Sequence, residues 1–208
     1  MKKVILYVFT ISFTLLSSCT DNDKDNEYLK TEQSTNLTEL EIEDLKFLRE
    51  EEKLARDVYL FSYDLYKLQI FKNISNSEQQ HMNSVLKLLN NYNLEDPAST
   101  IIGEFNNTEL QSIYNSLIEK SKKSLLDALE VGNIIEDLDI NDIALNEKRT
   151  SKIDILNVYS SLKCGSRNHL RNFNNQLLNN GGVYLPSYIS ENTFNSIINS
   201  DNEKCGSN

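Results

Sequence analysis

The stretch LKFLREEEKLARDVYLFSYDLY, residues 45–66, predicts a long helix packed in a bundle. From its first residue, positions separated by alternating steps of three and four fall on one helical face, as they do where bundled helices meet. These positions hold Leu45, Leu48, Glu52, Ala55, Tyr59, Ser62 and Tyr66. Glu52 is therefore the one charged residue in a row that is otherwise expected to be buried.

Further helices follow along the chain. Thr38 with Glu41 forms a capping box, which predicts a first helix from about residue 37 to 72. Ser75 with Glu78 forms another, which predicts a second helix ending near residue 92. Apolar spacing predicts a short helix over 108–120 and long helices over 121–146 and 151–179. Strand signals are nearly absent, so we expect an all-α fold, a four-helix bundle with a long crossover that contains the extra short helix.

Glycine and proline set the end of this domain. Gly181 and Gly182 end the last long helix, and Pro186 follows. We expect an irregular tail that wraps the domain through a few apolar residues, namely Tyr184, Tyr188, Phe194 and Ile197. The domain is then expected to cover residues 37–198, with a flexible C-terminus over 199–208.

The first 18 residues read as a signal peptide. Lys2 and Lys3 precede an apolar run over 4–16, which is shorter than the roughly 20 residues that a membrane span needs. The following LSSC, residues 16–19, resembles the lipobox of bacterial lipoproteins, and this resemblance implies lipidation at Cys19. The alternative is an ordinary signal peptide with a chance cysteine. We expect a disordered tether over 19–36 and a membrane-anchored protein of the bacterial cell envelope, periplasmic or surface-exposed.

The composition excludes one class of partner. The chain has 21 basic and 31 acidic residues, with a formal net charge of −10. Such a charge argues against binding to nucleic acid and to anionic lipid headgroups. Cys164 and Cys205 would meet an oxidising compartment after export, but Cys205 lies in the expected tail, which favours a buried free thiol at Cys164.

Five ionisable residues interrupt the apolar faces of the long helices, and at least one comes from each helix: Glu52, Glu78, His81, Glu136 and His169. An unpartnered buried carboxylate costs several kcal/mol, and enclosed cations would offset that cost. Glu78 and His81 form a Glu-x-x-His motif, the unit from which carboxylate-bridged di-iron and di-manganese bundles are built. The pattern therefore indicates one or two ions of iron or manganese.

A family resemblance selects the same residues. REEEKLARDVY (49–59) resembles the first ligand helix of rubrerythrins, in which the ligand glutamate precedes an Ala-Arg pair by three residues, as Glu52 does. SEQQHM (77–82) and VGNIIEDLDI (131–140) resemble the second and third ligand helices, and CGSRNHLRNF (164–173) supplies His169. The four blocks in this order, over about 38–198, also resemble the ferritin-like DUF2202 family. The resemblance implies a ferritin-like fold and a rubrerythrin-like oxidoreductase.

One position departs from the rubrerythrin pattern. Ser166 stands where the second Glu-x-x-His motif has its glutamate. The chain then holds one ion firmly and a second weakly, or it recruits Asp139 or Glu130 instead. Tyr59 is expected either to pack in the core or to hydrogen-bond to the ligands.

Each candidate also has a plainer interpretation. Glu78 would cap its helix, Glu52 would pair with Arg56, and the histidines would be hydrogen-bonded core residues. Glu50 and Glu51 are expected to be solvated, and Glu130 to face water.

Three functions remain open at this point. The leading hypothesis is a metalloprotein that performs redox chemistry on oxygen or peroxide and takes electrons from an external donor, because the chain lacks Cys-x-x-Cys pairs. The second is a non-catalytic module at a membrane surface that captures a metal or docks a protein. The third is a metal-free bundle with a closed hydrogen-bond network. A homodimer is compatible with each of them.

Overall fold

The structure is a computed structural model that describes residues 36–206. The predicted signal peptide, the lipidation site Cys19 and nearly all of the predicted tether lie outside the described residues. Within residues 36–206 the fold is all-helical, as predicted.

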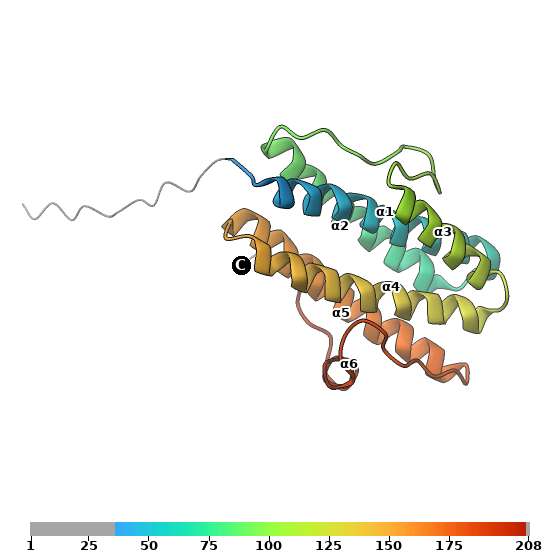
Figure 1. Cartoon of the computed structure of the whole chain (residues 1–208). Coiled ribbons are helices and arrows are strands. Elements are labelled where there is room, and N and C mark those ends of the chain that lie inside the picture. The colour runs from blue at the N-terminus through green and yellow to red at the C-terminus, as the bar shows by residue number, and fades with distance from the viewer. Residues whose placement is uncertain (1–35, 207–208) are drawn as a thin grey trace, which may run out of the picture. The chain divides into compact units, whose positions relative to one another are not determined.

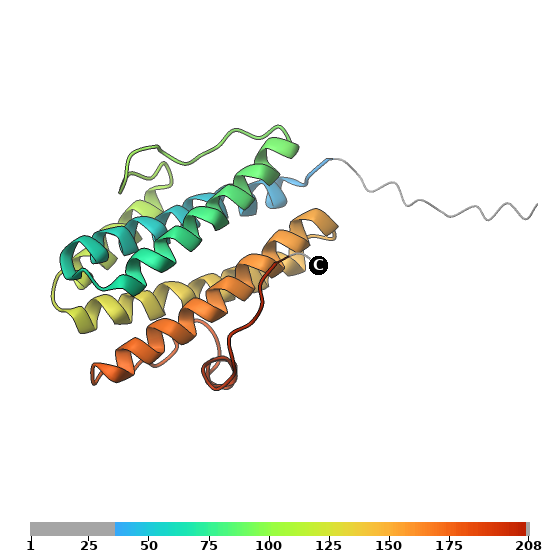
Figure 2. The same cartoon turned by 180° about the vertical axis from the view of Figure 1, so that it is seen from behind.

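Four long helices form a bundle (Figures 1 and 2). They are α1 (Glu39–Tyr66), α2 (Gln69–Asn91), α4 (Leu125–Asn146) and α5 (Ile153–Asn179). The crossover after α2 runs along the bundle and contains α3 (Thr108–Ser121), so that α2 and α4 point the same way (Figure 1). A short turn, η1 (Glu147–Arg149), joins α4 to α5, and α6 (Glu191–Ile198) lies in the tail. The predicted long crossover with an extra short helix is thus present.

The first two helices meet at a different place from the predicted one. The capping box of Thr38 and Glu41 opens α1, with a 3.2 Å bond from the Glu41 amide to the Thr38 hydroxyl. α1 ends at Tyr66 because Lys67 adopts a left-handed φ of 54°, and α2 starts at Gln69. Ser75 therefore lies inside α2, where its hydroxyl donates to the Lys72 carbonyl. The second predicted capping box is wrong, since α2 already begins at Gln69, before Ser75.

Charged side chains of α1 bind the backbone of the crossover segment between α2 and α3. The buried ammonium of Lys53 lies 2.7 Å from Asp57 and donates to the carbonyls of Ile101 and Glu104. The Glu50 carboxylate accepts from the amide of Asn106 at 2.7 Å. Glu50 is buried, so the expectation that it is solvated is wrong. These contacts fix the segment that leads into α3.

The tail is fastened by one buried carboxylate and one disulfide. Asp137 accepts from the Tyr184 hydroxyl and from the amides of residues 187–189. Tyr184, Phe194 and Ile197 are buried as predicted, whereas Tyr188 is 46% exposed. Cys164 forms a disulfide with Cys205, so the expectation of a free thiol is wrong. Glu203 pairs with Arg167 and Arg171, and these ion pairs bring Cys205 to α5.

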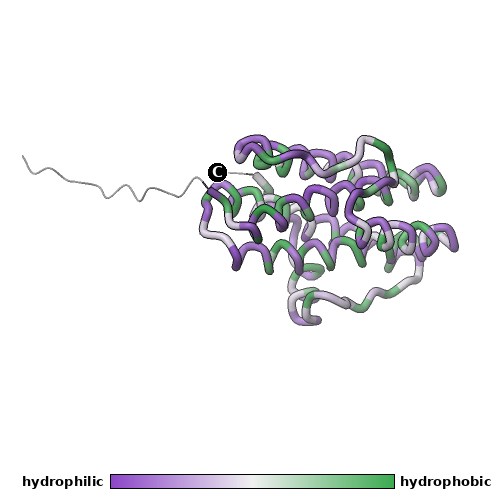
Figure 3. Tube along the Cα trace, turned by 45° about the horizontal axis from the view of Figure 1, so that its top comes forward, coloured by the Kyte–Doolittle hydropathy of each residue, from purple (hydrophilic) through white to green (hydrophobic). Residues whose placement is uncertain are grey.

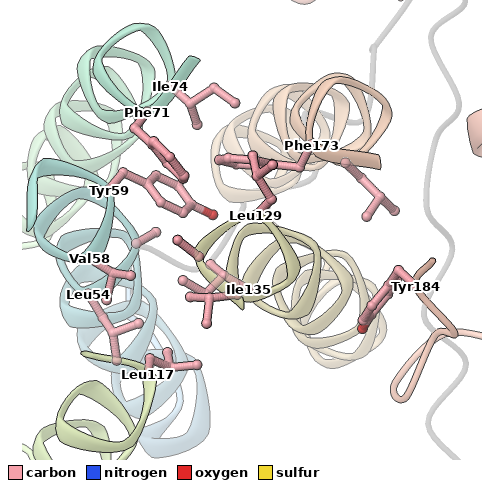
Figure 4. Close-up of a cluster of buried hydrophobic side chains, with 14 of the residues drawn as sticks. Leu54, Val58, Tyr59, Phe71, Ile74, Leu117, Leu129, Ile135, Phe173 and Tyr184 are labelled. Carbon is pink, nitrogen blue, oxygen red and sulfur yellow. The ribbon is translucent and has the colours of Figure 1, made fainter. Parts of the chain in front are cut away.

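Hydrophobic and hydrophilic residues alternate along the long helices, as expected for helices that bury one face (Figure 3). One apolar cluster contains three aromatic rings (Figure 4). Tyr59 of α1 packs on Phe173 of α5 with ring centroids 5.0 Å apart, and Phe71 of α2 also contacts Phe173. A second apolar cluster around Leu48, Val85 and Tyr159 fills the other end. None of the described helices is long and apolar enough to cross a membrane.

Candidate metal centre

The predicted ligand residues meet between the two apolar clusters. Glu52 comes from α1, Glu78 and His81 from α2, Glu136 from α4 and His169 from α5. The three carboxylates are 0% exposed, and both imidazoles are buried. The structure therefore brings the five residues together in one interior site.

The donor atoms form two groups that share one residue. Glu52, Glu78 and His81 form the first group, in which one atom from each residue lies within 4.8 Å of the others. Glu78, Glu136 and His169 form the second. Glu78 points one oxygen at each histidine: Oε2 lies 2.7 Å from Nδ1 of His81, and Oε1 lies 2.8 Å from Nδ1 of His169. This is the arrangement that a bridging carboxylate requires.

The short distances around Glu78 are not hydrogen bonds. Both Glu78 oxygens, Oε2 of Glu136 and Nδ1 of His169 are buried and have no hydrogen-bond partner. Ligands held about 2.1 Å from one ion at right angles are about 3 Å apart. The spacing thus fits donors grouped around cations better than a closed hydrogen-bond network.

Neighbouring residues fix the orientation of the candidate ligands. The Tyr59 hydroxyl donates to Oε1 of Glu136 at 2.6 Å, and Ser77 lies 3.0 Å from Nε2 of His169. Gly165 makes room for His81, since a Cβ there would lie 2.5 Å from its Nε2. Such outer contacts set the orientation of a ligand imidazole or carboxylate. Ser77 was not among the predicted residues, although it precedes Glu78 directly.

The pKa values of three site residues are shifted from their ordinary values. Burial raises the pKa of Glu52 to about 7, against the opposing effect of His81. Burial alone would lower the pKa of His169, but the carboxylates of Glu78 and Glu136 raise it to about 10. Burial acts to raise the pKa of Glu78, yet the two histidines outweigh it and hold that pKa below its usual range. Without cations, the cluster therefore keeps protons that a free carboxyl and a free imidazole would release.

Two more carboxylates lie beside the five residues. Asp139 is one helical turn beyond Glu136, and Glu51 precedes Glu52. Both are buried, and none of their four carboxylate oxygens has a hydrogen-bond partner. Burial and the neighbouring acids, including Glu52, raise the pKa of both well above the usual range. The expectation that Glu51 is solvated is therefore wrong.

The other two alternatives, Glu130 and Ser166, have partners outside the five residues. Glu130 is partly exposed and pairs with Lys120 at 3.0 Å. Ser166 is buried, but its hydroxyl donates to the Leu162 carbonyl at 3.1 Å. Of the residues considered as a replacement for the missing glutamate, Asp139 is thus the one whose free carboxylate faces the other acids.

Comparison with known protein families identifies the family of this chain. Residues 41–201, which include all seven of these acids and histidines, match the family described as "Uncharacterized protein domain (DUF2202)". The chain belongs to the DUF2202 family.

A relative of known structure supports the fold. The uncharacterised protein MJ0754 of Methanocaldococcus jannaschii is 48% identical over 179 residues, which is 86% of this chain and 97% of that protein. The crystal structure of the hypothetical protein MJ0754 superimposes with a TM-score of 0.79 at 50% identity, covering 81% of this chain and 97% of that one. The helical bundle is thus similar to that of an experimentally solved relative.

Proposed function

We propose that this DUF2202 protein is a ferritin-like metalloprotein that holds two ions of iron or manganese and uses them for redox chemistry on oxygen or peroxide. The observation that supports this most directly is the position of Glu78 between His81 and His169, with one carboxylate oxygen toward each. Glu52 and His81 would complete one ion's protein ligands, and Glu136 and His169 the other's.

The chemistry of the donors fits these metals. Carboxylates neutralise divalent cations, and imidazole favours transition metals over calcium and magnesium. Three protein groups for each ion, one of them shared, leave coordination positions free for water or an oxidant. Ser166 contributes to this openness, because its hydroxyl is turned to the helix backbone. When bound, the ions would supply the one-electron steps that protein side chains do not perform readily.

The protein's own residues would hold and shield the centre. Tyr59 orients Glu136, Ser77 orients His169, and the aromatic cluster of Tyr59, Phe71 and Phe173 closes one end to water. An external electron donor is part of the proposal, because no Cys-x-x-Cys pair occurs in the sequence. We further propose that a lipid on Cys19 attaches the protein to a membrane. Cys19→Ser would then abolish this attachment.

Metal content tests the proposal. The purified protein is loaded anaerobically with Fe²⁺ or Mn²⁺, freed of excess metal and examined by elemental analysis. We expect about two ions for each chain in the wild type, about one in a Glu52→Ala/His81→Ala variant, and fewer than one in Glu78→Ala. Glu130→Ala, which changes an acid outside the cluster, is the matched control and should keep two.

Two results separate the alternatives. If wild type binds no more of either metal than Glu78→Ala does, the metalloprotein reading fails. If it binds metal, but the bound Fe²⁺ is oxidised by air no faster than free Fe²⁺, the protein captures metal without redox chemistry.

A further inference from the structure

A cavity of about 320 Å³ lies between α1, α3 and α4, with Tyr188 of the tail at its margin. Its volume is within the usual range for small-molecule sites. The walls are mostly aliphatic, with α1, α3 and α4 all contributing: Leu54, Ile113, Leu117, Ile134, Ile135 and Leu138. Figure 4 shows Leu54, Leu117 and Ile135 on these three helices.

The inner side of this cavity borders the candidate metal centre. Glu51 and Asp139 belong to its lining, and each is a close chain neighbour of a proposed ligand. Asp139 lies one helical turn beyond Glu136, and neither of its carboxylate oxygens has a hydrogen-bond partner, so the cavity reaches the part of α4 that supplies a proposed ligand. The cavity thus leads from the surface of the bundle toward the side of the centre formed by α1 and α4.

The walls decide which molecules enter. A charged or strongly hydrogen-bonding molecule loses its hydration among aliphatic side chains, at a cost of several kcal/mol. Dioxygen is uncharged and has no hydrogen bonds with water to lose, whereas hydrogen peroxide has two hydroxyl donors. The cation in the lining, Lys120, is paired with Glu130 at 3.0 Å and so does not provide a free charge for an anion.

We propose that the cavity between α1, α3 and α4 admits dioxygen to the metal centre and thereby makes dioxygen, rather than peroxide, the preferred oxidant. The inference rests on the proposed function, because it requires a reducing centre at the inner end. With two Fe²⁺ ions bound, dioxygen would accept one electron from each, leaving two Fe³⁺ ions, and with two protons would become hydrogen peroxide. Peroxide accepting the same two electrons and two protons becomes two molecules of water.

Helix α3 offers a test that leaves every candidate ligand intact. Ser116 is solvent-exposed at the cavity, so Ser116→Trp should place an indole in the opening without strain in the core. Ser112→Trp on the same helix lies outside the lining and is the matched control. Ile113→Phe narrows the cavity from a second position, and thermal unfolding establishes that each variant is folded.

Xenon is the first probe, because it occupies apolar cavities whether or not metal is present. We expect xenon to shift the methyl NMR signals of Leu54, Leu117 and Ile135 in wild type and Ser112→Trp, and not in Ser116→Trp. Absence of these shifts in folded wild type overturns the inference and leaves the proposed metal function untouched.

Stopped-flow oxidation of the Fe²⁺-loaded proteins is the second probe. With dioxygen, Ser116→Trp should react about tenfold more slowly than wild type, while its rate with hydrogen peroxide changes by less than about twofold. Equal slowing with both oxidants, or slowing with neither, overturns the inference. Elemental analysis of the same samples shows separately whether metal is bound, so a failure of the proposed function is recognised as such.

Discussion

The hydroxyl of Tyr59 donates a 2.6 Å hydrogen bond to Oε1 of Glu136 and leaves Oε2 of that carboxylate without a partner. The free oxygen is the one that lies 3.4 Å from Nδ1 of His169. The ring of Tyr59 packs on Phe173, which in turn fills the space opposite Gly132, where a Cβ would lie 2.5 Å from that ring. One tyrosine therefore couples core packing to the position of a candidate ligand.

Replacing Tyr59 by phenylalanine should affect both properties. Loss of one buried hydrogen bond lowers the free energy of unfolding by about 1 kcal/mol, measured by urea denaturation. Metal affinity should fall by about 10–100-fold, measured by competition with a chelator, because Glu136 loses its orientation. Tyr66 lies on α1 like Tyr59, and Tyr66→Phe is the control, because it removes a 2.7 Å bond to the carbonyl of Ser121 on α3. An equal loss of affinity in both variants would contradict a specific role for Tyr59.

Asp139 should lower the stability of the metal-free protein and strengthen the binding of metal. Its buried carboxyl has no hydrogen-bond partner and four acidic neighbours. Asp139→Asn removes the charge, so the metal-free variant should be more stable than wild type by about 1 kcal/mol or more at pH 8. The same variant should bind metal more weakly. Glu130→Gln, at a partly exposed position of the same helix, should change stability by less than about 0.5 kcal/mol. A destabilised metal-free Asp139→Asn would show that the carboxylate has a favourable partner.

Stability of the metal-free protein should fall as pH rises from about 4.5 to 7. Glu52 has an ordinary pKa of 4.5 and a folded pKa of about 7. In this interval the folded state therefore binds a proton that the unfolded state lacks, and folding is favoured at the acidic end. The raised pKa of His169, from 6.5 to about 10, continues the decline above neutral pH.

Metal should reverse this dependence, because the ligands bind it in their deprotonated forms. The increase in melting temperature on adding Mn²⁺ should be larger at pH 8 than at pH 5.5, measured by differential scanning calorimetry. A metal-free melting temperature that rises between pH 5 and pH 7 would show that these groups are not buried together.

Reducing the Cys164–Cys205 disulfide should weaken the fold and spare the centre. The bond joins residues 41 apart, and closing a loop of that length contributes roughly 2–4 kcal/mol to the free energy of unfolding. Cys205→Ser should lower the melting temperature and increase hydrogen exchange in residues 199–206. Metal content should stay unchanged, since the five candidate ligands lie on the four long helices and none of them belongs to the tail. Loss of metal on reduction would instead connect the tail to the site.

Helical periodicity was enough to predict the four long helices, because the 3.6-residue repeat of apolar side chains reports directly which face is buried. Helix ends were less certain. Ser75 and Glu78 have capping-box spacing, but residues 69–74 already form the first part of α2. The turn between α1 and α2 is made at Lys67 instead. The same spacing occurs inside helices, so it indicates a start only when the residues before it are not helical.

The sequence by itself determined which helices supply Glu52, Glu78, His81, Glu136 and His169, because each interrupts an apolar face at a fixed register. It did not determine that Glu78 lies between the two histidines, that Glu51 and Asp139 are buried beside it, or that Cys205 reaches Cys164. Register within one helix follows from backbone geometry, whereas these contacts depend on how separate helices and the tail pack together. Tertiary packing therefore decided which charged residues form the candidate metal centre and which ones bind the crossover segment.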